Sequence, residues 1–254
     1  MTTLRFLTIG TGAKHVVVLH EWLGDHSNYD PILPYINTKQ FKWIFVDLRG
    51  YGLSKDLSGQ YTCQEASEDV QRLVSELGIH SVYIVGHSMS AMVAQKIAVD
   101  NPELLKKMLL ITPVPASGIQ INLEDANILR ASVFDDGKIR NAINLRTGER
   151  YNATWLDTKL KLANNASAPE ARAGYMEMFL ETDFSDKVKG LKIPVRVIVG
   201  KYDIPAFQKR TIQELFSDWY NDLEIIECSE SGHYPMLECP IFFASTLEKL
   251  ILDS

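Results

Sequence analysis

Ser88 has the sequence setting of a catalytic nucleophile. It follows the apolar run 82–85, and two small residues, Gly86 and Ser90, stand two positions before and after it. A turn that exposes a serine between a strand and a helix leaves little room for side chains at these positions. Ser90 stands where glycine is usual, and the pattern alone fits an ordinary tight turn equally well. Its place between a predicted strand and a predicted helix favours the nucleophile.

Asp203 and His233 have the types that a serine nucleophile needs as partners. A serine hydroxyl is a weak nucleophile at neutral pH, so a histidine must take its proton and a carboxylate must orient that histidine. Asp203 follows the apolar run 195–200, and His233 lies in the polar loop 229–240. Asp203 alone fits a turn or a helix cap as well. The chain order serine, aspartate, histidine favours a triad of Ser88 as nucleophile, Asp203 as acid and His233 as base.

The loop after the apolar run 16–19 is the expected source of an oxyanion hole. The backbone amide of Trp22 is placed to pair with that of Met89, the residue after the predicted nucleophile. We expect His20 to bond loop backbone rather than exchange protons. Glu21 stands where a second glycine is commoner.

These positions require a sheet whose strands end at one edge. Continuous apolar runs rich in β-branched residues recur between helix-like segments, which is typical of parallel strands covered on both faces. The runs are 16–19, 43–48, 82–85, 107–112, 195–200 and 223–228. We therefore predict an α/β fold in which a mostly parallel central sheet is flanked by helices. Residues 1–115 and 190–254 form this core, and the strand-free segment 116–189 forms an inserted helical lid.

The predicted lid is rich in large apolar side chains that are candidates to line a pocket. For any single residue, packing of the lid on the core is the simpler explanation. The candidate substrate contacts are His20, Trp155, Tyr175, Met178 and Tyr234. No acidic or basic cluster indicates a strongly charged substrate, although Lys201 and Arg49 are candidates for such contacts. The pattern favours a small apolar or aromatic substrate.

Composition limits the other classes of function. The chain has 254 residues and a formal net charge of -6, with acidic and basic residues mixed along it, so no basic patch indicates nucleic acid or an anionic membrane. Its three cysteines form no CxxC pair and have no histidines at metal-ligand spacing, so we predict neither a metal nor another cofactor. No membrane span or secretion signal is predicted, and we expect a cytoplasmic protein. The oligomeric state stays open.

Together these motifs resemble the α/β-hydrolase superfamily over nearly the whole chain except the lid. The segment 47–54 is similar to the D-x-R-G-x-G-x-S segment common in that superfamily. The resemblance to its small bacterial esterases implies hydrolysis of an ester-like carbonyl substrate through an acyl-enzyme on Ser88, without a cofactor. Lactonases, carbon–carbon bond hydrolases, perhydrolases and cofactor-free dioxygenases have similar triads, so these reactions stay open.

A receptor is the alternative from another class. The segment 86–92 is similar to the G-H-S-V-S-A-M elbow of the strigolactone and karrikin receptors, which retain a triad and serve mainly in perception. The loop 20–24 does not resemble theirs, which favours the enzyme. Epoxide hydrolases and dehalogenases of this fold resemble the chain less, because they use aspartate where it has Ser88.

Overall fold

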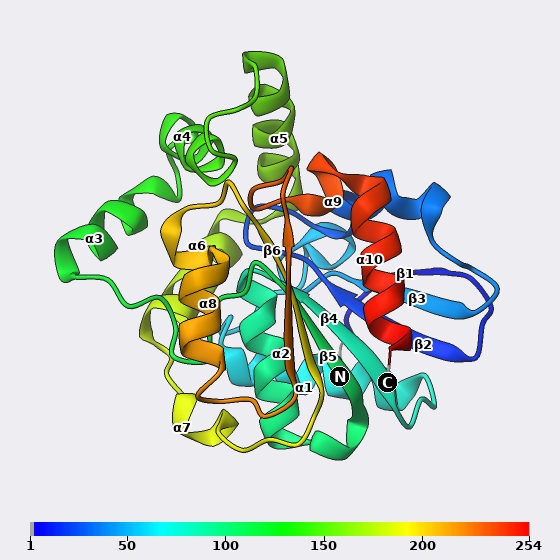
Figure 1. Ribbon diagram of the computed structural model, residues 1–254. Coiled ribbons are helices and arrows are strands. Elements are labelled where there is room, and N and C mark those ends of the chain that lie inside the picture. Colours follow the sequence, from blue (N-terminus) through cyan, green and yellow to red (C-terminus); the bar gives the residue numbers. More distant parts are fainter. Residues whose placement is uncertain (1–2, 254) are drawn as a thin grey trace.

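A computed structural model describes residues 3–253, which are built around a seven-stranded sheet (Figure 1). The strands are β1 (Phe6–Ile9), β2 (Lys14–Leu19), β3 (Phe41–Val46), β4 (Val82–His87), β5 (Leu105–Ile111), β6 (Val195–Gly200) and β7 (Leu223–Cys228). Their order is β1-β3-β2-β4-β5-β6-β7, and every pair except β1 with β3 is parallel. The predicted mostly parallel sheet is therefore confirmed. The antiparallel edge strand β1 was not predicted, because it is short and only partly buried.

Helices cover both faces of the sheet, because each parallel connection must cross back over one face. The helices α1 (Cys63–Glu76), α2 (Met89–Asp100) and α8 (Lys209–Phe216) lie on one face (Figure 1). The other face is covered by α10 (Pro240–Leu252) and the 3-10 segment η1 (His26–Tyr35), which contact each other. Every residue of β6 is buried, as its continuous apolarity predicts.

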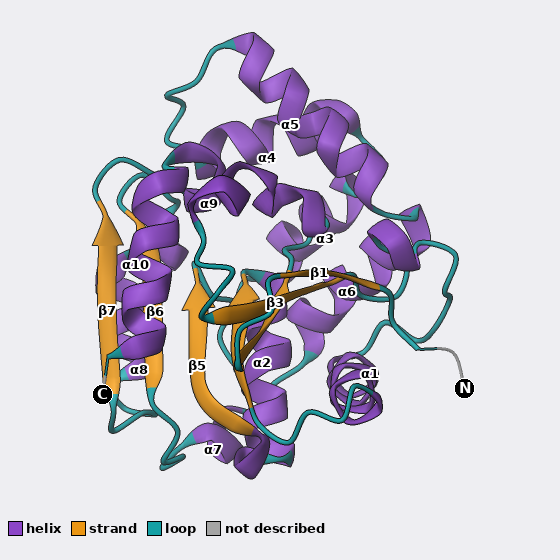
Figure 2. Ribbon diagram, turned by 90° about the vertical axis from the view of Figure 1, so that its right-hand side faces the viewer, coloured by secondary structure: helices purple, strands orange, loops and turns teal. Residues whose placement is uncertain are grey.

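Between β5 and β6 the chain is helical. This insertion consists of α3 (Leu123–Ser132), α4 (Asp136–Arg146), α5 (Ala153–Ala166), α6 (Pro169–Glu181) and α7 (Ser185–Val188). Asn122, Asp135 and Asn152 cap the first three of these helices, each accepting a hydrogen bond from a first-turn amide. Figure 2 shows α4 and α5 beyond the carboxyl ends of β5, β6 and β7. Helices α4 and α5 of the insertion therefore lie over the edge of the sheet at which the predicted triad positions follow their strands.

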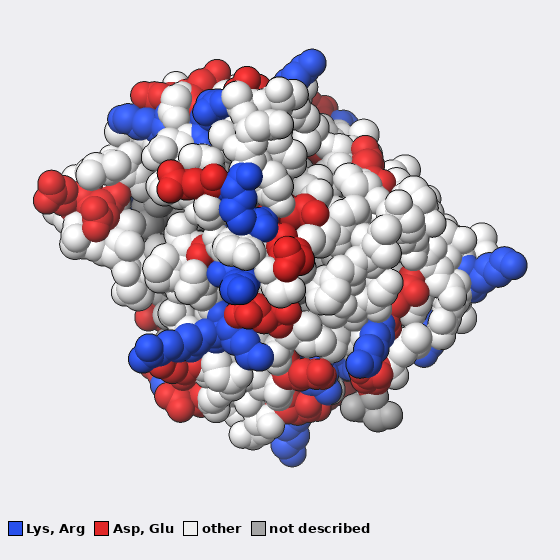
Figure 3. All heavy atoms as spheres, turned by 45° about the horizontal axis from the view of Figure 1, so that its top comes forward, with Lys and Arg blue, Asp and Glu red and all other residues white. Residues whose placement is uncertain are grey.

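Shorter elements complete the connections. They are η2 (Gly52–Ser54), η3 (Pro102–Leu104), η4 (Pro205–Phe207) and α9 (Pro235–Glu238). On the face seen in Figure 3, acidic and basic side chains are interspersed among broad uncharged areas. In residues 3–253 no helix has both the length and the apolarity needed to cross a membrane.

Candidate active site

Ser88 sits on a sharp turn between β4 and α2. Its backbone has φ 52° and ψ −111°, a conformation that L-residues rarely adopt. A Cβ atom at Gly86 would stand 2.6 Å from the carbonyl oxygen of Ser90, so the turn requires glycine there. The Ser90 hydroxyl donates a hydrogen bond to the carbonyl of His20. Serine in place of glycine at position 90 therefore ties the turn to the loop that follows β2.

The structure brings Ser88, Asp203 and His233 into one chain of hydrogen bonds. The distance from His233 Nε2 to Ser88 Oγ is 2.9 Å, and that from His233 Nδ1 to Asp203 Oδ2 is 2.5 Å. All three residues are buried. With the proton on Nδ1 donated to the carboxylate, Nε2 is free to accept the serine proton. This is the arrangement of a nucleophile, its general base and the carboxylate that orients the base.

Main-chain contacts hold the loop that carries His233. Its amide donates to the carbonyl of Arg146 over 2.9 Å, and its own carbonyl accepts from His87 Nε2 over 2.8 Å. A Cβ atom at Gly232 would lie 2.2 Å from the same Arg146 carbonyl oxygen. The end of α4 and the imidazole of His87 therefore fix the position of the base.

Burial keeps the two histidines beside Ser88 neutral at neutral pH. It lowers the pKa of His233 well below its ordinary value, and the nearby positive charge of Arg146 lowers it further. Burial likewise lowers the pKa of His87 to about 3. Burial raises the pKa of Asp203, and Arg146 and the amide of Ile204 oppose that rise. A neutral His233 is the protonation state that can accept a proton from Ser88.

Glu21 holds the loop after β2 through a buried ion pair. Its carboxylate accepts from Lys159 Nζ of α5 at 2.8 Å, from Asn28 Nδ2 at 3.1 Å and from the amide of Leu23. Burial would raise the pKa of Glu21, yet Lys159 and the hydrogen bond from the amide of Leu23 help to lower it to about 2. A residue that stands where glycine is commoner thus links the loop to the helical insertion.

The predicted oxyanion residues are Trp22, in this loop, and Met89, the first residue of α2. Both are buried. The Trp22 carbonyl accepts a hydrogen bond from the Tyr51 hydroxyl over 2.9 Å, and its indole Nε1 donates to the carbonyl of Arg172 over 2.7 Å. These contacts fix Trp22 between Tyr51, in the segment after β3, and Arg172 of α6. The helix that begins at Met89 directs its first amides toward Ser88, where they favour negative charge.

An apolar groove of about 580 Å³ borders the triad. It runs between α3, α4 and η4, and the lining side chains include Ile128, Leu129, Ala142, Leu145, Phe207 and Arg146. The ring of Phe207 packs edge-on against that of His233, with 4.8 Å between the ring centroids. A molecule in this groove would therefore lie next to the histidine of the triad.

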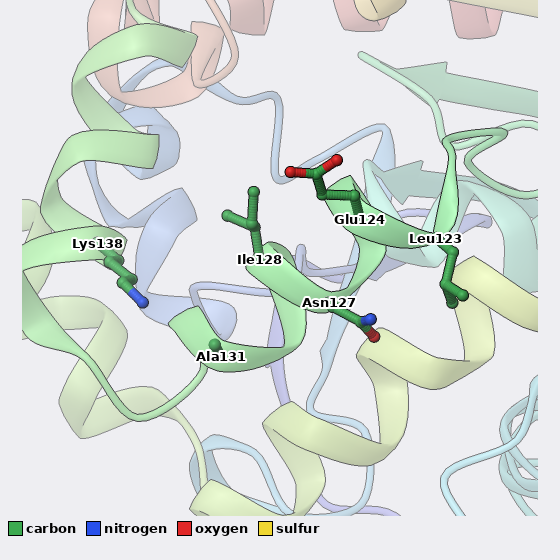
Figure 4. A pocket seen from close by; sticks show the side chains of 6 residues that line it. All are labelled: Leu123, Glu124, Asn127, Ile128, Ala131 and Lys138. Carbon is green, nitrogen blue, oxygen red and sulfur yellow. The ribbon is translucent and has the colours of Figure 1, made fainter.

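A second hollow of about 640 Å³ lies along α3 (Figure 4). Leu123, Glu124, Asn127, Ile128 and Ala131 of α3 line it, and Lys138 faces them from α4. No member of the triad and no residue that contacts His233 lines this hollow. We therefore place the candidate substrate site in the groove that ends at Phe207.

None of the five candidate substrate contacts lines the apolar groove. Both ring nitrogens of His20 are used, since Nδ1 donates to the carbonyl of Glu21 and Nε2 accepts from the amide of Leu48. Tyr175 is buried against Tyr51, with ring centroids 5.7 Å apart. Met178 is buried as well.

Tyr234 and Trp155 lie nearer the triad than the other candidates. The Tyr234 ring stands edge-on to that of His233 at 5.3 Å, and its hydroxyl has no hydrogen-bond partner among residues 3–253. The ring centroid of Trp155 lies 6.3 Å from that of Tyr234, and the Trp155 ring stacks on Tyr151.

Arg146 and Phe207 are groove residues that sequence reasoning missed. An arginine in the last turn of a helix is an ordinary partner for the helix dipole, so nothing local marks Arg146. Of the two charged candidates named from the sequence, Arg49 is occupied by an ion pair with Asp69, and Lys201 is exposed. Among residues 3–253, no group of histidine, cysteine and acidic side chains is arranged to hold a metal ion.

The fold and the site define an esterase-type hydrolase of the α/β-hydrolase class. Residues 14–225 match the model of the alpha/beta hydrolase fold family, and the chain belongs to that family. It is 25% identical to a pimeloyl-[acyl-carrier protein] methyl ester esterase of Klebsiella pneumoniae, over 97% of both chains. It is also 25% identical to a strigolactone esterase of Arabidopsis thaliana, over 99% of this chain and 97% of that one.

A solved structure has the same architecture. An esterase from Exiguobacterium antarcticum superposes with a TM-score of 0.88 and 17% identity, over 98% of this chain and 96% of that one. At this identity the likeness shows the fold alone.

Proposed function

We propose that this chain is a serine esterase that cleaves a small, largely apolar ester through an acyl-enzyme on Ser88. The observation that carries the proposal is the position of His233, within hydrogen-bond distance of both Ser88 Oγ and Asp203 Oδ2. The esterases among its relatives support the same class of reaction.

In the first half-reaction Ser88 Oγ attacks the ester carbonyl while His233 Nε2 takes the serine proton. The carbonyl oxygen becomes an oxyanion, which we assign to the backbone amides of Trp22 and Met89. The carbon–oxygen bond of the ester then breaks, and His233 gives its proton to the departing alcohol. Asp203 keeps the imidazole in one tautomer and stabilises its cation throughout.

In the second half-reaction a water molecule attacks the acyl-enzyme. His233 takes a proton from the water, the oxyanion forms again on the same amides, and the proton returns to Ser88 Oγ as the acid leaves. We assign α3 to α7 as a lid over this chemistry and the groove beside Phe207 as the place for the apolar part of the substrate. Tyr234 and Trp155 remain the candidate contacts on the lid side.

The test is hydrolysis of a short series of p-nitrophenyl esters and lactones by the wild type and by Ser88→Ala. We expect Ser88→Ala to lower kcat by about 10⁴-fold or more, because the nucleophile and its base act as a unit. Ser217→Ala, at an exposed serine of the same chain, is the matched control and should keep the wild-type rate. A fluorophosphonate should label the wild type and leave Ser88→Ala unlabelled. An unchanged rate in Ser88→Ala would overturn the nucleophile assignment.

A slow-turnover ligand receptor is the second candidate function. The likeness to the strigolactone esterase and the shared elbow segment favour it. An enzyme should reach the ordinary kcat range of about 1 to 1,000 per second on its proper substrate, whereas a receptor turns over far more slowly. Labelling of Ser88 with negligible turnover on all esters and lactones would favour the receptor.

A further inference from the structure

Among residues 3–253, Arg146 is a buried cation without an acidic counterion. The residue is 8% exposed, and its Nη1 atom has no hydrogen-bond partner among residues 3–253. No acidic side chain of the described chain forms an ion pair with it. Leaving a buried charge unpaired costs several kcal/mol, so proteins usually supply a counterion. The missing counterion is therefore a feature that calls for an explanation.

The other buried cations of the insertion are satisfied. Lys159 pairs with Glu21 over 2.8 Å, and the guanidinium of Arg172 donates to the carbonyl of Ala163 over 2.8 Å and to Ser167 Oγ over 3.0 Å. Arg146 thus differs from its neighbours in lacking protein acceptors for its charge.

Arg146 is not the counterion of Asp203. One carboxylate oxygen of Asp203 contacts His233, and the other accepts the amide of Ile204 over 2.8 Å. Burial still raises the pKa of Asp203 despite the nearby guanidinium. The charge of Arg146 remains available to another anion.

The position of this cation suits a substrate. Arg146 lines the apolar groove, its guanidinium carbon lies 6.0 Å from the centroid of the Phe207 ring, and its carbonyl accepts the amide of His233.

We propose that Arg146 binds a carboxylate of the substrate while the apolar part lies in the groove. A guanidinium presents paired N–H donors that match a carboxylate, and in a buried site this pairing is strong. One guanidinium balances the single charge of a carboxylate, whereas a phosphate monoester carries about −1.5 to −2 at pH 7. The other charged residues that line the groove, Asp125, Asp135 and Lys138, carry a net charge of about −1, which disfavours the more highly charged anion. The substrate class is then the ester of an apolar acid that also bears a free carboxylate, and this assignment rests on the proposed function.

The test compares two esters that differ in one charge. The monomethyl and dimethyl esters of the same dicarboxylic acid, with chains of about five to eight carbons, place a carboxylate or a neutral ester at the same distance. We expect Arg146→Met to lower the ratio of kcat/KM for the monomethyl over the dimethyl ester by about 30-fold or more, mainly through KM. Arg146→Lys should restore part of the ratio. An unchanged ratio in Arg146→Met would overturn the proposal.

Arg140→Met is the matched control, because Arg140 lies on the same helix and pairs at the surface with Asp157. It should leave the ratio at the wild-type value. A fall in the ratio equal to that of Arg146→Met would show a general effect of charge on the lid and would overturn a specific role of Arg146.

A binding measurement separates this proposal from the esterase proposal. In a Ser88→Ala background, calorimetry should show that Arg146→Met weakens binding of the monomethyl ester by about 30-fold or more, and that of the dimethyl ester far less. If this difference is found while the wild type hydrolyses none of the esters, the esterase proposal is overturned and the carboxylate site is supported. Ser88-dependent hydrolysis by the wild type, together with binding of the monomethyl ester that Arg146→Met does not change, would support the esterase proposal and overturn the carboxylate site. Tighter binding of an alkyl phosphate than of the carboxylate would overturn the choice of ligand.

Discussion

Two buried cations flank the histidine of the triad, and the fold treats them differently. Lys159 of α5 contacts the carboxylate of Glu21, the carbonyl of Leu23 over 2.7 Å and Asn28 Oδ1 over 3.4 Å. Arg146, at the end of α4, has none of these acceptors. Both arise from the helical insertion and both lie close enough to His233 to lower its pKa. Lys159, whose charge is paired, holds a loop in place, whereas the charge of Arg146 is available for the proposed ligand.

The same difference decides the electrostatics of the base. Glu21 raises the pKa of His233 and Lys159 lowers it, so the effects of this pair oppose each other. Arg146 lowers the pKa without such a companion. The charge state of the triad histidine therefore depends on Arg146 more than on the ion pair.

Lys159→Met should give the largest loss of stability. Removing one partner of a buried pair leaves the Glu21 carboxylate uncompensated, which costs about 3–5 kcal/mol. Arg146→Met removes a charge that has no partner, so it should cost no more than about 1 kcal/mol. Urea unfolding of the two variants measures both values. Equal losses would contradict the distinction between a paired and an unpaired cation.

The double variant Glu21→Gln/Lys159→Met should recover much of that loss. Without the carboxylate, no buried charge remains unpaired, so the second substitution should cost at least about 2 kcal/mol less than it does alone. A double-mutant cycle by urea unfolding gives this coupling energy. Additive effects of the two substitutions would mean that Lys159 acts through packing on Tyr234, whose ring centroid is 4.7 Å from Nζ, rather than through Glu21.

The pH dependence of kcat/KM tests the effect on the base. With His233 as the proposed base, we expect activity to need its neutral form, so the rate should fall as pH drops through its pKa, which burial places well below the ordinary 6.5. Arg146→Met removes a positive charge, so it should raise this pKa and move the acid limb to higher pH. The neutral dimethyl ester is the substrate to use, because it does not contact the guanidinium as an anion. An acid limb of the kcat/KM profile that stays in place, or moves to lower pH, would contradict the effect of Arg146 on the pKa of His233.

The smallest change in stability is expected from a substitution at the exposed surface of α4, the helix that ends at Arg146. Arg140 pairs with Asp157, whose side chain is 65% exposed, and exposed ion pairs contribute about 0.2–1 kcal/mol. Arg140→Met should therefore change the free energy of unfolding by less than about 1 kcal/mol. A loss as large as that of Lys159→Met would show that burial does not decide the strength of these pairs.

Much of the fold was predictable because it depends on short stretches of chain. Continuous apolarity identified the six strands β2 to β7, since such runs must be covered on both faces, and Gly86 and Ser90 marked the turn at Ser88. The edge strand β1 has only four partly buried residues and so carries no such pattern. The amphipathic segments of the insertion correspond to α3 to α6, since their caps and spacing are local as well.

The binding surface was not predictable in the same way. Three of the five predicted substrate contacts, Trp155, Tyr175 and Met178, were large side chains of the lid, and the other two lay in loops after strands. The groove is formed instead by the faces that α3 and α4 turn toward η4. Which face of a helix meets a cavity depends on how the helices pack, and the weak amphipathic character of α4 leaves that open.

The sequence by itself determined the sheet, the turn that presents Ser88 and the strand ends at which Asp203 and His233 stand, because these follow from residue types within a few positions of each other. Only the tertiary structure decided which charges are paired. Glu21 meets Lys159 across 138 positions of the chain, and Arg146 comes to lie beside His233 without any acid of its own. The physical reason is that the cost of a buried charge depends on the neighbours that packing brings to it, and those neighbours come from distant segments.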